Sequence, residues 1–266
     1  MADWPPALRQ TTVVPVTRRP VLLLLTAVLL SGCADVATPD DEELPGAAPS
    51  STSASATPSP TPASDDPAGC PVDGAAGVPD GAASRPTIDV DGDDRPDTAW
   101  IADAGDGEVR FGVATASGGG ASAPFPSASP VTRSVLVADV TGEGELVALA
   151  DDGRQVLLFA LSGCEIVPVT DPEGAPYAFD LGFTGYGTGV GCVDVDGDGV
   201  RDLAGLDAAD DGTGYTATAV RLDGPRASNT DVSITVSDAP PAQVEAARSV
   251  TCGDLSLLDD GVALPG

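Results

Sequence analysis

Short apolar runs separated by polar turns dominate the second half of the chain. One group of runs rich in Val and Leu covers residues 134–140, 146–150, 155–161 and 164–169. A second group covers residues 189–195, 202–206, 215–222 and 231–236. Asp-Gly, Glu-Gly and Ser-Gly pairs, which favour turns, separate the runs of the first group. The pattern therefore predicts two groups of four β-strands, and only residues 242–247, after Pro240 and Pro241, have a helical pattern.

An acidic motif recurs at the start of these groups. Residues 89–97 read DVDGDDRPD and residues 194–202 read DVDGDGVRD, so both place Asp at relative positions 1, 3, 5 and 9. A weaker copy begins at Asp139, and the Arg-Ser-Val that precedes it recurs before Asp254. Repeats of roughly 50 to 60 residues with about four strands each are typical of propeller blades.

The repeats predict an all-β fold, a small propeller-like array of about four repeat units. An open β stack or a sandwich is the alternative. The last unit has room for two strands at most, so we expect residues 70–84 to complete it from the other end of the chain.

Carboxylates at alternate positions of a tight turn place several hard oxygens on one side of the chain. Calcium requires about six to eight such oxygens. The predicted calcium ligands are the side chains of Asp89, Asp91, Asp93 and Asp97 with the carbonyl of Arg95, and the side chains of Asp194, Asp196, Asp198 and Asp202 with the carbonyl of Val200. Without a cation, each set of four carboxylates would repel one another. Solvated Asp-Gly turns are the alternative interpretation.

The loops do not meet the requirements of an EF-hand. That motif needs Glu at position 12, Gly at position 6 and flanking helices. Here position 12 is Trp100 or Gly205, and strands flank both loops.

At these two loops the sequence resembles the FG-GAP or VCBS repeat family, which includes the integrin α-subunit head. The resemblance covers residues 84–266 and implies a β-propeller-like scaffold with calcium as a structural ion. The sequence departs from the family's pattern at three places. Asp94 stands where the family usually has Gly, Val147 stands where the second unit should have its last Asp, and no series of alternate acidic residues follows Asp254. These departures leave metal binding in the second and fourth units open.

The N-terminus has the order of an export signal. Arg9, Arg18 and Arg19 precede an apolar run at residues 21–30 and then Gly32-Cys33. The run is too short for a membrane span, which needs about 20 residues. Its end resembles the lipobox of bacterial lipoproteins, which implies cleavage after residue 32 and lipid attachment at Cys33. An ordinary signal peptide is the alternative.

The predicted domain organisation has three parts. Residues 1–32 form the lipoprotein signal peptide, residues 33–68 form a linker of Ser, Thr, Pro and acids, and residues 69–266 form the β repeat domain. The linker has almost no large apolar residue, so it cannot offset its ordering entropy and is expected to be disordered. The mature protein is expected at the cell membrane, lipid-anchored and facing the extracellular or periplasmic side.

Charge and missing residue types narrow the chemistry. The net charge is -29, which disfavours nucleic acid and favours divalent cations or basic partners. The chain has neither His nor Lys, which excludes Ser-His-Asp and Cys-His catalysis, His-ligated zinc and Schiff bases.

Apart from Cys33, the chain has four cysteines, an even number that predicts two disulfides in an oxidising compartment. We expect Cys164 to pair with Cys192, because this would tie the second unit to the third. The other expected pair is Cys70 with Cys252, which would fasten the N-terminal segment to the last unit.

The function expected from these features is a non-catalytic binding or scaffold module for an envelope protein or a glycan. The alternative is a carbohydrate-active enzyme with a carboxylate pair outside the metal loops, drawn from Glu108, Glu145, Glu165 and Glu245. A close pair in an aromatic-lined cleft would favour the enzyme.

Overall fold

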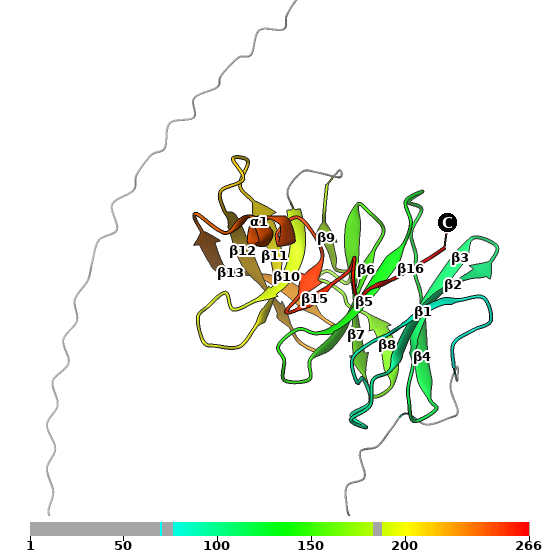
Figure 1. Cartoon of the computed structure of the whole chain (residues 1–266). Helices are drawn as coiled ribbons and strands as arrows, with labels where there is room; N and C mark the ends of the chain where they lie inside the picture. The colour runs from blue at the N-terminus through cyan, green and yellow to red at the C-terminus, as the bar shows by residue number, and fades with distance from the viewer. Residues whose placement is uncertain (1–69, 71–76, 183–187, 266) are drawn as a thin grey trace, which may run out of the picture. The chain divides into compact units, whose positions relative to one another are not determined.

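The computed structural model describes residue 70, residues 77–182 and residues 188–265. They all belong to one compact unit, Thr61–Gly266. The expected signal peptide, Cys33 and the linker lie outside the described residues. The described part is built from antiparallel β-sheets with one short helix, so the all-β prediction is confirmed (Figure 1). No described helix is long and apolar enough to cross a membrane.

Three sheets of four or more strands follow one another along the chain, and the first four strands of each are hydrogen-bonded in chain order. The first sheet contains β1 (Ala83–Pro86), β2 (Thr98–Gly105), β3 (Glu108–Ala114) and β4 (Gly120–Pro124). The second contains β5 (Ser134–Asp139), β6 (Leu146–Asp151), β7 (Gln155–Ser162) and β8 (Glu165–Pro168), with β9 (Ala178–Asp180) also paired to β7. The third contains β10 (Thr188–Val193), β11 (Asp202–Ala208), β12 (Tyr215–Leu222) and β13 (Ala227–Val236).

The second sheet is buried on both faces. Successive side chains of a strand point to opposite faces, so β5 contributes to two cores. Val135 and Val137 pack with residues of the first sheet, whereas Leu136 and Ala138 pack with residues of the third. This double burial explains why the strands of this sheet are continuous apolar runs rather than alternating ones.

The third sheet has a helix on its outer face. Helix α1 (Pro241–Ala246) has Pro241 at its first position, which suits the start of a helix because proline lacks an N–H. Its Val244 is buried against Leu206 and small residues of β11 and β12. The predicted helix is thus present, displaced by one residue.

The expected fourth unit is only a two-stranded hairpin, formed by β14 (Thr251–Cys252) and β15 (Leu255–Ser256). The hairpin lies beside β10, and the chain then returns to the second sheet as β16 (Val262–Ala263), which pairs with β5. Residues 83–86 form the edge strand of the first sheet, so the N-terminal segment does not complete a fourth unit. The expectation of four units is therefore wrong for the described residues, because the tail extends existing sheets.

The four cysteines form two disulfides, as predicted, but the pairing is different. Cys70 is joined to Cys164, and Cys192 is joined to Cys252. The expected pairs Cys164 with Cys192 and Cys70 with Cys252 are wrong. Cys70 lies against Gly119 of the turn before β4, where any side chain would overlap it, and its disulfide reaches Cys164 in the turn before β8 of the second sheet. Cys192 on β10 is next to the β14 hairpin that carries Cys252.

Candidate metal centre

The first acidic loop connects β1 to β2 and is folded around the carboxylate of Asp89. Its Oδ1 accepts a hydrogen bond of 2.8 Å from the main-chain N–H of Gly92, and its Oδ2 accepts one of 2.7 Å from Asp94. Gly92 has φ of +76°, which glycine adopts without the strain that a side chain would add. The loop therefore curls inward around its first carboxylate.

Asp97 closes the loop at the foot of β2. It is only 2 % exposed, and its two oxygens accept hydrogen bonds from the N–H groups of Val90 at 2.7 Å and Ala116 at 2.8 Å. Burial raises the pKa of Asp97, and the negative charges of Asp91 and Asp89 raise it further, against the lowering effect of the two hydrogen bonds. A nearby cation would relieve this electrostatic cost.

Asp91 faces the same space from the middle of the loop. Its Oδ2 accepts hydrogen bonds from the main-chain N–H of Cys70 at 3.1 Å and from the hydroxyl of Ser117 at 2.6 Å. Burial raises the pKa of Asp91, but these hydrogen bonds outweigh it and lower the pKa below its ordinary value. Its Oδ1 is buried and has no hydrogen-bond partner among the described residues.

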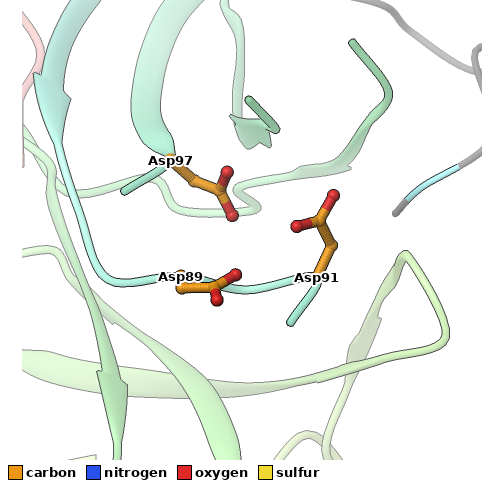
Figure 2. A group of neighbouring side chains, drawn as sticks. All are labelled: Asp89, Asp91 and Asp97. Atoms are coloured by element: carbon orange, nitrogen blue, oxygen red, sulfur yellow. The ribbon is translucent and has the colours of Figure 1, made fainter. Parts of the chain in front are cut away.

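Figure 2 shows the carboxylates of Asp89, Asp91 and Asp97 gathered around one space. One oxygen from each lies within 4.8 Å of the others. Asp93 is not in this group, because its Oδ1 accepts a hydrogen bond from the N–H of Arg95 at 2.9 Å and its carboxylate forms an ion pair with Arg95. The structure thus gathers three of the four predicted carboxylates, and the carbonyl of Arg95 stays a prediction.

The loop between β10 and β11 repeats this construction. Asp194 accepts hydrogen bonds from the N–H groups of Gly197 at 2.7 Å and Gly199 at 3.0 Å. One oxygen from each of Asp194, Asp196 and Asp202 lies within 4.8 Å of the others. Asp198 instead accepts a hydrogen bond of 2.8 Å from the N–H of Val200, whose carbonyl stays a predicted ligand.

The two groups differ in exposure. In the first group Asp97 is buried and the other two carboxylates are half-buried, whereas in the second Asp194 and Asp196 are exposed and Asp202 is half-buried. The first site is therefore less exposed to solvent than the second.

The loop between β5 and β6 has the same fold without the acidic group. Asp139 accepts hydrogen bonds of 2.8 Å from the N–H groups of both Gly142 and Gly144. Thr141 replaces the second carboxylate, and the buried Val147 replaces the last. The described residues of this loop form no three-carboxylate group. In the tail, Asp254 lies in the turn between β14 and β15.

Sequence reasoning missed the contacts that the first loop receives from elsewhere. Ser117 lies in the turn between β3 and β4, and Cys70 precedes the repeats. Neither residue belongs to the acidic motif, so no signal in the repeat pointed to them.

The glutamates considered for catalysis are spread over the described residues. Glu108 and Glu165 are exposed, and Glu108 forms an ion pair with Arg110. Glu145 is half-buried between the second and third sheets, where burial and then the charge of Asp139 raise its pKa. Glu245 lines a cavity of about 930 Å³ together with Asp151 and Asp259. No aromatic side chain of the described residues lines this cavity.

Comparisons with protein-family models, curated proteins and solved structures found no match for this chain.

Proposed function

We propose that the chain is an exported lipoprotein, anchored by lipid at Cys33, whose β domain is a calcium-stabilised and non-catalytic binding module. Its three sheets would form a propeller-like array of the FG-GAP or VCBS type. The observation that carries the metal assignment is that two loops, about 100 residues apart, each gather the first, third and ninth residues of the motif into one carboxylate group.

The chemistry of the two groups favours calcium. Both offer only oxygen atoms, which hard cations prefer, and the chain has no His. The described cysteines are in disulfides, so none offers a thiolate. The buried Oδ1 of Asp91 has no hydrogen-bond partner in the described part of the chain, and a cation would satisfy this atom. Calcium accepts irregular oxygen cages more readily than magnesium does.

The positions of the acidic residues support a binding role. The strongest clusters of carboxylates lie in loops at the ends of strands, where they hold the backbone through several hydrogen bonds. Cation binding would make these loops rigid, and the sheets would then present a fixed surface to an envelope protein or a glycan. The membrane is reached through the lipid, and nucleic acid is disfavoured by the charge.

The cavity lined by Glu245 and Asp151 supports the second candidate function, a carbohydrate-active enzyme. Burial raises the pKa of Asp151, and the charge of Asp152 raises it further, which is a property of general acids. The lack of a described aromatic side chain in the cavity makes the binding module the preferred proposal.

The test is a calcium titration of the full chain carrying Cys33→Ala, followed by affinity capture from an envelope extract in calcium or in chelator. The proposal expects two calcium sites, one lost in Asp91→Asn and the other in Asp196→Asn, and a partner retained only in calcium. Cleavage of a glycan that is lost in Glu245→Gln would establish the enzyme instead.

A further inference from the structure

β13 is the longest described strand and forms an edge of the third sheet (Figure 1). Among the described strands only β12 pairs with it, so its other side presents main-chain N–H and C=O groups without strand partners. The register shift in this pairing lies before Ser233, and residues 233–236 pair regularly with β12. The second half of β13 therefore offers a regular main-chain edge.

Residues 231–235 of this strand are all exposed. Because successive side chains point to opposite faces, neither face of the sheet is covered there. Val232 is 44 % exposed and Ile234 is 39 % exposed, whereas the other exposed large apolar residues of the described chain lie outside strands. Ile234 is opposite Ala217, which is buried with Val244 of α1. The helix therefore covers β12 but leaves Ile234 exposed.

The composition of β13 does not prevent pairing with another chain. Edge strands of soluble proteins are usually protected by proline or by charged side chains, Lys above all. β13 has no proline and no basic residue, and Asp231 is its one charged side chain. Half of its ten residues are Val, Ile or Thr, which favour strands.

A cavity of about 460 Å³ lies beside residues 235–236, at the end of this edge. Asp207, Asp210 and Asp211 line it, and no basic residue of the described chain does, so we call it the acidic cavity. All three carboxylates are exposed. Hydrogen bonds from the hydroxyl and the N–H of Thr213 lower the pKa of Asp211, so its carboxylate is ionised at neutral pH. The charge of the acidic cavity suits a basic side chain.

We infer that the outer edge of β13 accepts an extended, basic segment of another protein as an added strand. The two main chains exchange hydrogen bonds, apolar side chains of the segment cover Val232 and Ile234, and a basic side chain enters the acidic cavity. The net charge of -29 disfavours a second copy of this chain as the partner. The inference rests on the proposed role as a binding module, and it commits that module to a protein rather than a glycan.

The experiment uses the full chain carrying Cys33→Ala, in calcium, and a peptide of alternating Lys and Val as long as β13. Bound peptide should slow amide hydrogen exchange at residues 231–235 by roughly tenfold. A peptide of the same sequence with every main-chain nitrogen methylated keeps the side chains and charges but has no N–H to donate. It should leave this exchange unchanged.

The apolar contribution is tested with Val232→Ser combined with Ile234→Ser. This variant should bind the Lys-Val peptide about fivefold more weakly in fluorescence anisotropy, because cross-strand apolar pairs are lost. Val131→Ser removes an equally exposed valine outside the strand and should bind like the parent.

The charge contribution is tested with Asp210→Asn combined with Asp211→Asn, which should weaken binding about fivefold. Asp103→Asn with Asp106→Asn removes the same charge from the exposed turn between β2 and β3 and should change the affinity little.

No binding of the Lys-Val peptide, or equal binding by the Val232 and Ile234 double variant, would overturn the inferred edge. Slowed exchange with the methylated peptide would also overturn it, because charge alone would then explain the contact. An envelope protein captured equally by the parent and by this double variant would overturn the edge and leave the binding module standing.

Discussion

The main-chain N–H of Cys70 donates a hydrogen bond of 3.1 Å to the carboxylate of Asp91. A disulfide-bonded residue therefore orients a candidate cation ligand, because Cys70 is joined to Cys164 of the second sheet. The second acidic loop also has a disulfide close by, since Cys192 lies two residues before Asp194.

Loss of the first disulfide should weaken calcium binding at the first loop. In Cys70→Ser with Cys164→Ser, residue 70 is no longer fixed to the second sheet, and the hydrogen bond to Asp91 loses its orientation. We expect about a tenfold weaker affinity, the equivalent of one hydrogen bond to a charged group of about 1.5 kcal/mol. Calorimetric titration in an Asp196→Asn background isolates the first site. An unchanged affinity would show that the disulfide does not position Asp91.

Calcium should raise the melting temperature of the full chain carrying Cys33→Ala. A hundredfold excess of calcium over Kd stabilises by about 2.7 kcal/mol per site, or roughly 5 to 10 °C for a domain of this size. Asp91→Asn should remove one site's share of this shift. Asp93→Asn should remove less, because Asp93 is outside the carboxylate group. Equal losses in the two variants would place Asp93 among the ligands.

Asp151→Asn should stabilise the protein at neutral pH. Burial raises the pKa of Asp151, so its ionised form is disfavoured in the folded state. The stability that this carboxyl contributes is complete below the unfolded pKa of about 3.9 and is lost as the pH rises through the raised folded value. In thermal unfolding, the variant should therefore have a higher melting temperature than the parent at pH 7 and the same melting temperature near pH 3.5. The N–H of Gly153 donates a hydrogen bond to Oδ1 of Asp151, and the side-chain oxygen of Asn can accept the same bond.

Tyr177 should titrate well above the ordinary pKa of a tyrosine hydroxyl. Burial raises its pKa to about 12, and its hydroxyl donates a hydrogen bond of 2.6 Å to Oδ1 of Asn229 on β13. Tyr177→Phe should cost about 1 kcal/mol in the free energy of unfolding. Alkaline difference absorbance should lose the transition near pH 12 in this variant. Tyr215→Phe serves as the control, and it should leave that transition in place.

Cys33→Ala should abolish acylation. The variant is then expected in the medium or as an uncleaved precursor, since the lipid is the proposed anchor. Labelling with a radioactive fatty acid and fractionation of cells provide the measurement. Normal processing with retention at the membrane would remove the lipoprotein assignment.

The sequence predicted the second and third sheets closely because their signals are local. Apolar runs bounded by Gly turns placed the strands of the second sheet to within about two residues, and the acidic motif placed both carboxylate groups. The contacts of Ser117 and Cys70 with the first loop join residues far apart in sequence. So does the hydrogen bond from the Arg201 guanidinium to the main-chain carbonyl of Asp139. Nothing in the spacing of such residues encodes which surfaces will meet.

The tail and the disulfides show the same limit. The expected fourth unit followed from a repeated Arg-Ser-Val, but β16 adds to the open edge of β5 instead. An edge strand offers unpaired N–H and C=O groups to any nearby extended segment, whatever its place in the repeat. The disulfide pairing then followed from the sheets that these segments joined.

The disulfide between Cys70 and Cys164 also determines how the domain would carry mechanical load. In the proposed tethered arrangement, tension from the membrane enters the described domain at Cys70. The bond closes a loop with a sequence separation of 94 residues, which contains the whole first sheet. A force applied at Cys70 would therefore pass through the disulfide to Cys164, in the turn before β8. The first sheet lies within the closed loop, so the force would bypass it and leave it folded.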